Sequence, residues 1–215
     1  MAIVKFPTDE ELHEAFIPYV CALGKVVHAW NYLHLKLGQL YVVIADGTRE
    51  DLLRDWYSDK VDTNQRKRIR KAVESSPEDR WLPRLPEVRA DLLWLVDQVD
   101  AMAEPRNNAI HAPCCSATGA EGTVMIASFF TGHPRAKNLQ GVNLPEEFEW
   151  LERRTEALSY CTMHLETVLG FPQYPRRDRP ILPERGRAEA ASLLTEATEA
   201  ALHDFSAAPG RWATR

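Results

Sequence analysis

The chain has 215 residues, of which 45% are hydrophobic and 27% are charged, and its formal net charge at pH 7 is -5. This length suits one folded domain with a sizeable core, followed by a tail, and the composition excludes a disordered or fibrous class. The negative net charge argues against a protein that wraps nucleic acid non-specifically, because affinity for phosphates comes mostly from Lys and Arg.

The first predicted element is a long helix. Thr8-Asp9-Glu10-Glu11 is a capping-box pattern, in which the Thr hydroxyl and a Glu carboxylate each satisfy a free backbone N–H at a helix start. From Phe16 to Ala45 apolar residues recur at helical spacing, which favours a long helix with one buried stripe. That stripe comprises Val26, Trp30, Leu33, Leu37, Leu40 and Ile44. We expect Pro18 and Gly24 to break or kink the early part of this helix.

Two short helices are expected next. Asp46-Gly47 ends the long helix, and Thr48 can cap a helix that runs to about Tyr57. The second short helix is predicted from Thr63 to Val73 and contains a basic run, made of Arg66, Lys67, Arg68, Arg70 and Lys71. This run is either a local contact surface for RNA or the solvated face of a helix, and the sequence supports the two interpretations about equally.

A second long helix carries the most informative motif of the chain. Its apolar stripe comprises Val88, Leu92, Leu95, Val96 and Val99, which is a clean helical period. The helix leads directly into Arg106-Asn107-Asn108-Ala109-Ile110-His111. We expect Pro105, which has no backbone N–H, to set this segment apart as a helical turn of its own.

Beyond Pro113 the residue pattern changes to one that is typical of strands. Residues 123–130 are β-prone and residues 131–134 suggest a turn, so we predict a small hairpin whose second strand lies near Ala136 to Leu144. Pro145 then suits the first turn of another helix, which Gly170 ends. The predicted fold class is therefore mainly α, with a small β-hairpin inserted after the motif.

The last part of the chain has a different composition. From Phe171 to Pro183 prolines and arginines predominate, which suggests an extended arm rather than core. A final helix is predicted from about Glu184 to Phe205, with a weak apolar face that either packs on a partner or stays loosely attached. We therefore divide the chain into a helical domain, 1–170, and a tail, 171–215.

The motif from Arg106 to His111 resembles that of the HEPN superfamily, whose usual signature is Arg, often followed by Asn, with His after four to six intervening residues. Asn107 follows the Arg here, and the motif stands at the end of a long amphipathic helix, as in that family. The resemblance covers roughly Phe16 to Gly170 in the order of elements. It implies an up-and-down helical bundle and a homodimer in which two Arg/His pairs meet in one cleft.

The residue types of the motif also suit RNA cleavage on chemical grounds, independently of the resemblance to HEPN proteins. RNA carries its own nucleophile, the 2′-hydroxyl, so an enzyme needs only to move protons and to stabilise charge on the phosphorus. His111 can exchange a proton near neutral pH, and the planar guanidinium of Arg106 matches two phosphate oxygens. Asn107 could orient the imidazole or contact phosphate, and Asn108 could reach a base or the scaffold.

A third catalytic residue is left open by the sequence. Many HEPN proteins carry an acidic residue on the first long helix, near a Trp, whereas this chain offers Asn31 or His34 beside Trp30. His28 and His34 are more simply packing or interface residues, His133 a turn residue and His164 a core residue. The motif also has a purely structural interpretation, in which Arg106 only caps a helix end and His111 is only a histidine at a helix C-terminus.

The sequence predicts neither a metal nor a cofactor. The four cysteines form no CxxC pair, and adjacent Cys114 and Cys115 are poorly spaced as ligands of one zinc. No stretch approaches the roughly 18 uncharged apolar residues of a membrane span and no signal peptide is recognisable, so we expect a cytoplasmic protein that does not enter membranes.

Two functions follow as hypotheses. The first is a metal-independent RNA endonuclease of the toxin or antiphage kind, which the family resemblance implies would leave a 2′,3′-cyclic phosphate. The second is a catalytically inert helical dimer that binds RNA, nucleotide or a protein partner. In either case the tail could clasp a second subunit or an inhibitor such as an antitoxin. Aromatic residues such as Trp30 and Trp94 also favour a homodimer, because one small bundle does not readily hide them.

Overall fold

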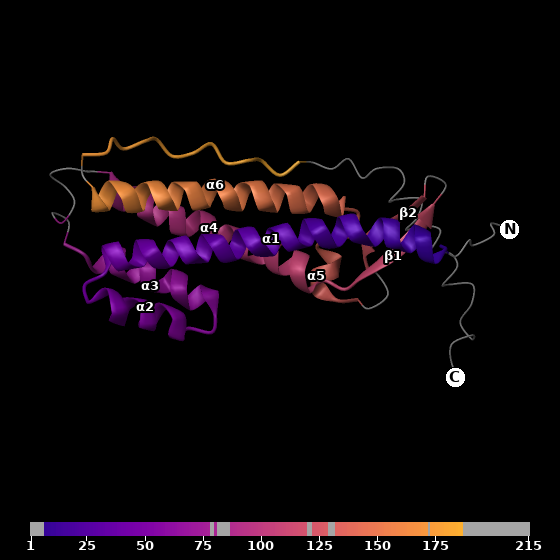
Figure 1. Ribbon diagram of the computed structural model, residues 1–215, viewed down its shortest axis with the longest axis horizontal. Coiled ribbons are helices and arrows are strands. Elements are labelled where there is room, and N and C mark those ends of the chain that lie inside the picture. The colour runs from indigo at the N-terminus through magenta and orange to yellow at the C-terminus, as the bar shows by residue number, and fades with distance from the viewer. Residues whose placement is uncertain are drawn as a thin grey trace. The chain divides into compact units, whose positions relative to one another are not determined.

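A computed structural model describes residues 7–77, 80, 87–119, 122–128, 132–171 and 173–186. The described chain is mainly helical, with one small antiparallel sheet, which confirms the predicted class (Figure 1). The elements are α1 (Asp9–Ile44), α2 (Arg49–Ser58), α3 (Asp62–Ser75), α4 (Val88–His111), β1 (Cys114–Gly119), β2 (Gly122–Ala127), α5 (Pro134–Lys137) and α6 (Leu144–Gly170). No helix among the described residues combines the length and the apolar character needed to cross a membrane.

Helix α1 begins at the predicted capping box. The backbone N–H of Thr8 donates to the Glu11 carboxylate at 2.7 Å, and the N–H of Glu11 donates to the Thr8 hydroxyl at 3.2 Å. The helix continues through Pro18 and Gly24, so the break that we considered at these residues does not occur. Pro18 and Glu14 are both exposed, so water can reach the Glu14 carbonyl that Pro18 leaves without its helical donor.

The chain divides into two compact units. Unit 1 contains residues Met1–Lys25, Asn107–Trp150 and Arg185–Arg215, and unit 2 contains Val26–Arg106 and Leu151–Glu184. The long helices contribute to both units, and the boundary within α4 falls between Arg106 and Asn107. Each unit is described separately below.

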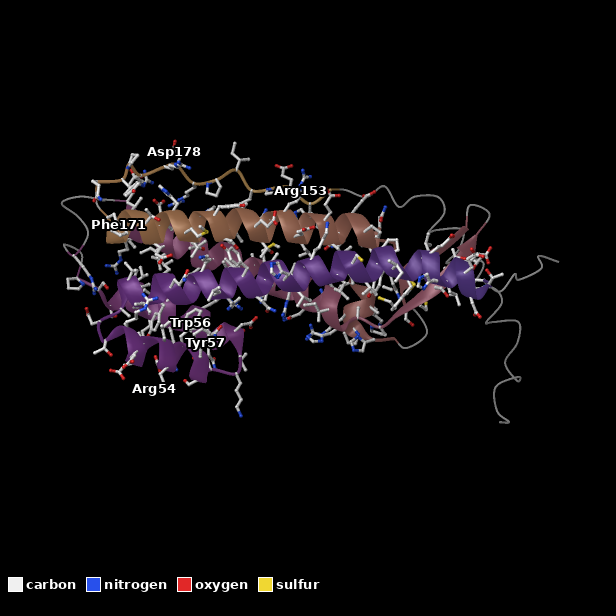
Figure 2. The ribbon with its side chains drawn as sticks, in the orientation of Figure 1. Arg54, Trp56, Tyr57, Arg153, Phe171 and Asp178 are labelled. Atoms are coloured by element: carbon white, nitrogen blue, oxygen red, sulfur yellow. The ribbon has the colours of Figure 1, made fainter. Side chains whose placement is uncertain are left out.

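The core of unit 2 is built on the predicted stripe of α1. Val26, Trp30, Leu33, Leu37, Leu40 and Ile44 are all buried, as are Ile69 and Val73 of α3 and Leu92, Leu95 and Val99 of α4. Trp56 of α2 lies between α2 and α1 (Figure 2) and is fully buried. A Cβ atom at Gly38 would lie 2.8 Å from the Trp56 indole nitrogen, so this close approach requires glycine. Trp30 is only 2% exposed within one copy of the chain. This side chain therefore does not support the homodimer, although we predicted that it would.

Unit 1 contains the hairpin, although not with the predicted partner strand. Strand β2 pairs with β1, which precedes it, and the register joins Cys114 to Ala127 and Gly119 to Gly122. The segment predicted to pair, Ala136 to Leu144, instead includes the end of α5 and the first residue of α6. Residues 114–118 contain Cys, Ser and Thr rather than a long apolar run, which hid the first strand from a hydrophobicity pattern.

Helix α4 extends through Pro105 to His111, so the motif is not a separate turn as predicted. A proline inside a helix removes one backbone hydrogen bond, and Ala101, whose carbonyl would have accepted it, is exposed to water. The arm begins with a turn at residues 173–174, closed by a hydrogen bond of 3.0 Å from the Tyr174 N–H to the Phe171 carbonyl, and residues 175–183 are extended (Figure 1), as predicted. Residues 184–186 are also extended, and the rest of the predicted C-terminal helix lies outside the described residues.

Candidate functional site

The residues of the motif lie on the last turns of α4. Arg106 belongs to unit 2 and is half-buried, whereas Asn107, Asn108 and His111 belong to unit 1. His111 is the last residue of the helix and is exposed, Asn107 is partly exposed, and Asn108 is only 7% exposed. Residues five apart in a regular α-helix are about 140° apart around its axis, so Arg106 and His111 do not share one helix face.

Arg106 takes part in a cluster of polar side chains within unit 2. We name it the Trp30 cluster, and it comprises Trp30, His34, Asp62, Arg66 and Arg106. The guanidinium carbon of Arg106 lies 5.4 Å from the centroid of the Trp30 ring, and that of Arg66 lies 5.8 Å from it. Guanidinium groups at such distances from an indole make favourable cation–π contacts. Burial lowers the pKa of Arg106, Asp62 raises it and Arg66 lowers it, with a net decrease.

Asp62 is the carboxylate of this cluster. Its Oδ2 atom accepts a hydrogen bond of 3.0 Å from the Trp30 indole, and its Oδ1 atom lies 3.5 Å from a terminal nitrogen of Arg66. Burial raises the pKa of Asp62, but the Trp30 hydrogen bond and the nearby cations outweigh this effect and hold the pKa below its ordinary value. Asp62 is therefore ionised at neutral pH.

His34 lies on α1, one helical turn after Trp30. The centroids of the two rings are 5.1 Å apart, and the Nδ1 atom of His34 lies 2.9 Å from Oε1 of Gln65. The amide nitrogen of Gln65 donates to the carbonyl of Trp56 at 3.1 Å, so the amide oxygen faces His34. An amide oxygen only accepts, so we infer that Nδ1 carries the proton and that Nε2 of the neutral ring has a lone pair.

The Nε2 atom of His34 is buried 3.9 Å from Oδ2 of Asp62, and among the described residues it has no hydrogen-bond partner. Burial lowers the pKa of His34, the Gln65 hydrogen bond and Asp62 raise it, and Arg66 and Arg106 lower it, with a net decrease. The ring is therefore neutral at physiological pH. A neutral imidazole beside a carboxylate and two guanidinium groups is a combination that can accept a proton while cations hold an anion.

Sequence reasoning did not identify Asp62 or Gln65 as site residues. The spacing of Asp62 and Arg66, four residues apart on one helix, signals an ion pair. The contact between His34 and Gln65 joins α1 to α3 across 31 positions of sequence, and no local pattern signals it. Of the two residues that the sequence left open as a third contributor, Asn31 is exposed and His34 lies in the cluster.

The arginines of the basic run are held by carboxylates. Arg66 donates to Asp100 at 2.5 Å, Arg70 donates to Asp97 at 2.6 Å, and Arg68 donates to Asp55 and Asp59. The hydrogen bonds that Arg68 donates to Asp59 and Arg70 donates to Asp97 are the main reason that the pKa values of these two arginines are raised. Lys67 and Lys71 are exposed. The two lysines are therefore the members of the run that are placed best for contact with phosphates.

Within the part of the chain that the structure describes, the other histidines and the cysteines do not form a second centre of this kind. Among the described residues, no three His, Cys, Asp or Glu side chains gather as metal ligands would. His28 is exposed, and His133 caps α5 by accepting a hydrogen bond of 3.3 Å from the N–H of Arg135. All four cysteines are free thiols.

No model of a known protein family matches the chain, no curated protein is significantly similar to it, and no solved structure matches its fold.

Proposed function

We propose that the chain is a metal-independent RNA endonuclease of the HEPN type, with a toxin or antiphage role. The observation that carries the proposal is the position of Arg106, the arginine of the motif, in the same cluster as His34 and Asp62. This arrangement supplies a fixed cation for a phosphate and a neutral histidine for a proton. Two such groups are what cleavage by the 2′-hydroxyl of RNA requires.

Each residue of the motif has a role in this proposal. Arg106 neutralises the charge that develops on the phosphate, and its partial burial strengthens this interaction relative to one in open water. His111, exposed at the end of α4, exchanges protons with the substrate. Asn107 orients the reacting groups or contacts phosphate. Asn108 is nearly buried, so of the two roles predicted for it, support of the scaffold suits it better than contact with a base.

His34 is the third contributor that we favour. Its Nε2 atom lies closed off from water, so a substrate hydroxyl reaches it only if a neighbouring side chain moves. Arg106 is the partly exposed cation of the cluster, and a bound phosphate would draw its guanidinium outward. In that state Nε2 of His34 would accept the proton of the 2′-hydroxyl, and Asp62 would stabilise the resulting imidazolium. The 2′-oxygen would then bond to phosphorus as the bond from phosphorus to the 5′-oxygen breaks, and His111 of the second copy would donate a proton to the leaving 5′-oxygen.

The proposal includes a homodimer and a regulatory partner. In the HEPN arrangement the second copy brings a second Arg106 and His111 to a shared cleft, so the acid and the base of one reaction come from different chains. An RNA-cutting toxin also needs a silencing partner, such as an antitoxin.

We propose Lys67 and Lys71 as the first contacts for the RNA backbone, with Arg66, Arg68 and Arg70 contributing where an RNA phosphate replaces a carboxylate.

A catalytically inert helical dimer is the second candidate. One specific observation favours it, namely that Asp62 lies within the Trp30 cluster and already pairs with Arg66 at 3.5 Å. A carboxylate at this position repels a phosphate, and ion pairs of this kind also occur where their role is only structural. Such a protein would bind RNA, nucleotide or another protein without cutting.

Incubation of the purified protein with total cellular RNA and EDTA, followed by end-group analysis, separates the two candidates. An endonuclease of the proposed type produces 2′,3′-cyclic phosphate and 5′-hydroxyl ends, and the His111→Ala variant does not. Circular dichroism should show that the variant is folded as well as the wild type. Binding of RNA by the wild type without any new ends would favour the inert dimer instead.

A further inference from the structure

The arm that follows α6 is held to unit 2 mainly by polar contacts. Residues 173–184 run back along α6 (Figure 1), and the guanidinium of Arg154 donates to the carbonyl of Pro183 at 2.9 Å. The large apolar side chains of the arm are exposed, with Ile181 at 98% and Tyr174 at 52%. Burial of apolar surface therefore contributes little to the attachment, and the state of each polar contact decides how firmly the arm is held.

One of these contacts uses a histidine side chain as the acceptor. The backbone N–H of Arg177 donates to Nε2 of His164 on α6 at 2.9 Å. The sequence suggested a core residue here, but His164 is partly exposed and lies against the arm. Because a backbone N–H only donates, Nε2 must have a lone pair, and the proton of the neutral ring is on Nδ1. This hydrogen bond therefore exists only while the ring is neutral.

The charged groups around His164 belong to the arm and to α4. Burial lowers the pKa of His164, Arg177 and Arg176 lower it further, and Asp91 of α4 raises it, with a net decrease. Asp178, the next residue of the arm, lies on the side that faces away from α6 (Figure 2), so it does not offset these arginines at the ring. The neutral ring is therefore the form that is present at neutral pH.

Asp91 connects His164 to the main ionic anchor of the arm. Its side chain is only 5% exposed, and both of its oxygens accept hydrogen bonds of 2.8 Å, Oδ2 from Arg176 and Oδ1 from Arg179. Cys161, three residues before His164 on α6, is influenced by the same carboxylate, and burial is the main cause that raises its pKa to about 11. Of the side-chain types in this set, only histidine ordinarily changes its charge between pH 5 and 8.

Protonation of His164 would change three interactions of the arm. Nε2 would become a donor, so the hydrogen bond from the Arg177 N–H would be lost and two donors would face each other. The imidazolium would repel the guanidinium groups of Arg176 and Arg177. It would also compete with Arg176 for Asp91, because both cations would then lie near one carboxylate. All three changes weaken the attachment of the same segment.

We propose that His164 is a pH-sensitive latch for the arm, which holds residues 175–179 against unit 2 while the ring is neutral and releases them when the ring is protonated. The release is local, because Arg154 donates to the Pro183 carbonyl and, at 2.8 Å, to Gln98, and groups of these types do not titrate near neutral pH. The released segment therefore stays tethered at the end of α6 and at Pro183. The latch does not depend on whether the protein cuts RNA.

The latch should be closed above about pH 6.5, the ordinary pKa of histidine, and should open as the pH falls toward the lowered pKa of His164 in the folded state. Loss of one hydrogen bond typically shifts an equilibrium about two- to tenfold, and like-charge repulsion adds to this, so we expect the open form to increase at least about fivefold. Opening also draws Arg179 away from α4, where its guanidinium carbon lies 5.4 Å from the centroid of the Trp94 ring. Acidification would therefore uncover an anionic and aromatic surface around Asp91 and Trp94.

Amide hydrogen exchange of the full chain, resolved at single residues and corrected for the intrinsic rate at each pH, tests the latch. In the wild type, protection of the Arg177 N–H should fall at least about fivefold between pH 7.5 and pH 5. In His164→Gln the side-chain amide oxygen can accept the same N–H at either pH, so protection should not change. His164→Phe has no acceptor and should have weak protection at both pH values. His28→Gln is the matched control, because His28 is exposed on α1, and it should behave as the wild type does.

Equal protection of the wild-type Arg177 N–H at both pH values would overturn the latch, and so would an equal loss of protection in the wild type and in His164→Gln. The N–H of Leu165, within α6, should stay protected, and a matching loss there would show unfolding in place of a local release. An NMR titration of the wild type needs no variant. The ring of His164 and the amide of Arg177 should titrate with one midpoint, and different midpoints would assign the release to another group and contradict the latch.

Discussion

The amide oxygen of Gln65 lies 2.9 Å from Nδ1 of His34, and this contact fixes the chemical state of the histidine. The Gln65 amide is itself oriented by its hydrogen bond of 3.1 Å to the Trp56 carbonyl. The proton of the neutral ring is therefore on Nδ1, and the lone pair on Nε2 faces the region of Asp62. A chain of two hydrogen bonds thus leaves Nε2 of the neutral ring as an acceptor, which is the state that the proposed role of His34 as a base requires.

Replacement of Gln65 by Glu should raise the pKa of His34. A carboxylate in place of the amide favours the imidazolium, and it opposes the decrease that burial causes in the wild type. The His34 titration, followed by NMR of the ring, should move to higher pH. Gln39→Glu is the matched control, because Gln39 accepts from Lys36 and not from a histidine, and it should leave the His34 titration in place. An unmoved titration in Gln65→Glu would show that the two side chains are not coupled.

The stability of the protein should fall as the pH decreases below about 6.5, the ordinary pKa of histidine. The pKa values of His34 and His164 are lowered in the folded state, mainly by burial, so the unfolded chain binds protons more readily in this range. Their contribution to stability is complete above pH 6.5 and declines as the pH falls toward the folded-state values. Urea unfolding of the wild type and of His34→Gln at several pH values measures this. The variant should show a smaller decrease, and an equal decrease would remove His34 as a cause.

Replacement of Gly38 by Ala should destabilise the fold by about 1 to 3 kcal/mol, the usual effect of overpacking. The added Cβ atom would lie 2.8 Å from the Trp56 indole nitrogen, and neither α1 nor α2 can move away without loss of packing. Gly24→Ala on the same helix is the matched control. No atom lies within 4 Å of the Cβ position there, so this change should stabilise the helix by about 0.5 to 1 kcal/mol. Chemical denaturation of both variants gives the comparison, and equal effects would contradict the packing described for Trp56.

Neutralising Lys67 and Lys71 together should flatten the salt dependence of RNA binding. For single-stranded RNA, each lysine–phosphate pair adds about 0.7 to the slope of log K against log salt, so removal of two pairs should reduce the slope by about 1.4. Arg68→Gln and Arg70→Gln should reduce the slope less, because their guanidinium groups are already paired with carboxylates. Fluorescence anisotropy at several salt concentrations measures the slopes. A larger decrease of the slope in the arginine variants would contradict this prediction. It would mean that RNA phosphates replace the carboxylates that pair with Arg68 and Arg70.

The helices could be predicted from the sequence because their signals are local. The capping box at Thr8, the cap at Thr48 and the apolar stripes of α1 and α4 each depend on residues within a few turns of one another. The predicted partner of the hairpin strand was wrong, because Cys114 and its neighbours lack the apolar alternation by which a strand is recognised. The effect of Pro105 was overestimated, since exposure to water satisfies the carbonyl that a proline leaves free.

The candidate site could be predicted only where it lies within the motif. Arg106 and His111 were identified from their spacing, and their catalytic roles remain predictions. The surroundings of Arg106 could not be predicted, because Trp30, Asp62 and Arg106 come from three different helices. The arginines of the basic run illustrate the same limit. The sequence indicates a positive surface, whereas the fold brings Asp55, Asp97 and Asp100 to these side chains.

The rate of cleavage of one defined RNA in EDTA, with and without a single 2′-deoxy substitution at the scissile nucleotide, tests the central claim most directly. We expect the wild type to cut the all-ribose RNA, to leave the 2′-deoxy RNA intact, and to lose about a hundred- to ten-thousand-fold in rate in Arg106→Ala and in His111→Ala. Thermal melting should confirm that both variants remain folded. Cleavage of the 2′-deoxy RNA at the wild-type rate, or an unchanged rate in His111→Ala, would contradict cleavage by the 2′-hydroxyl at this site.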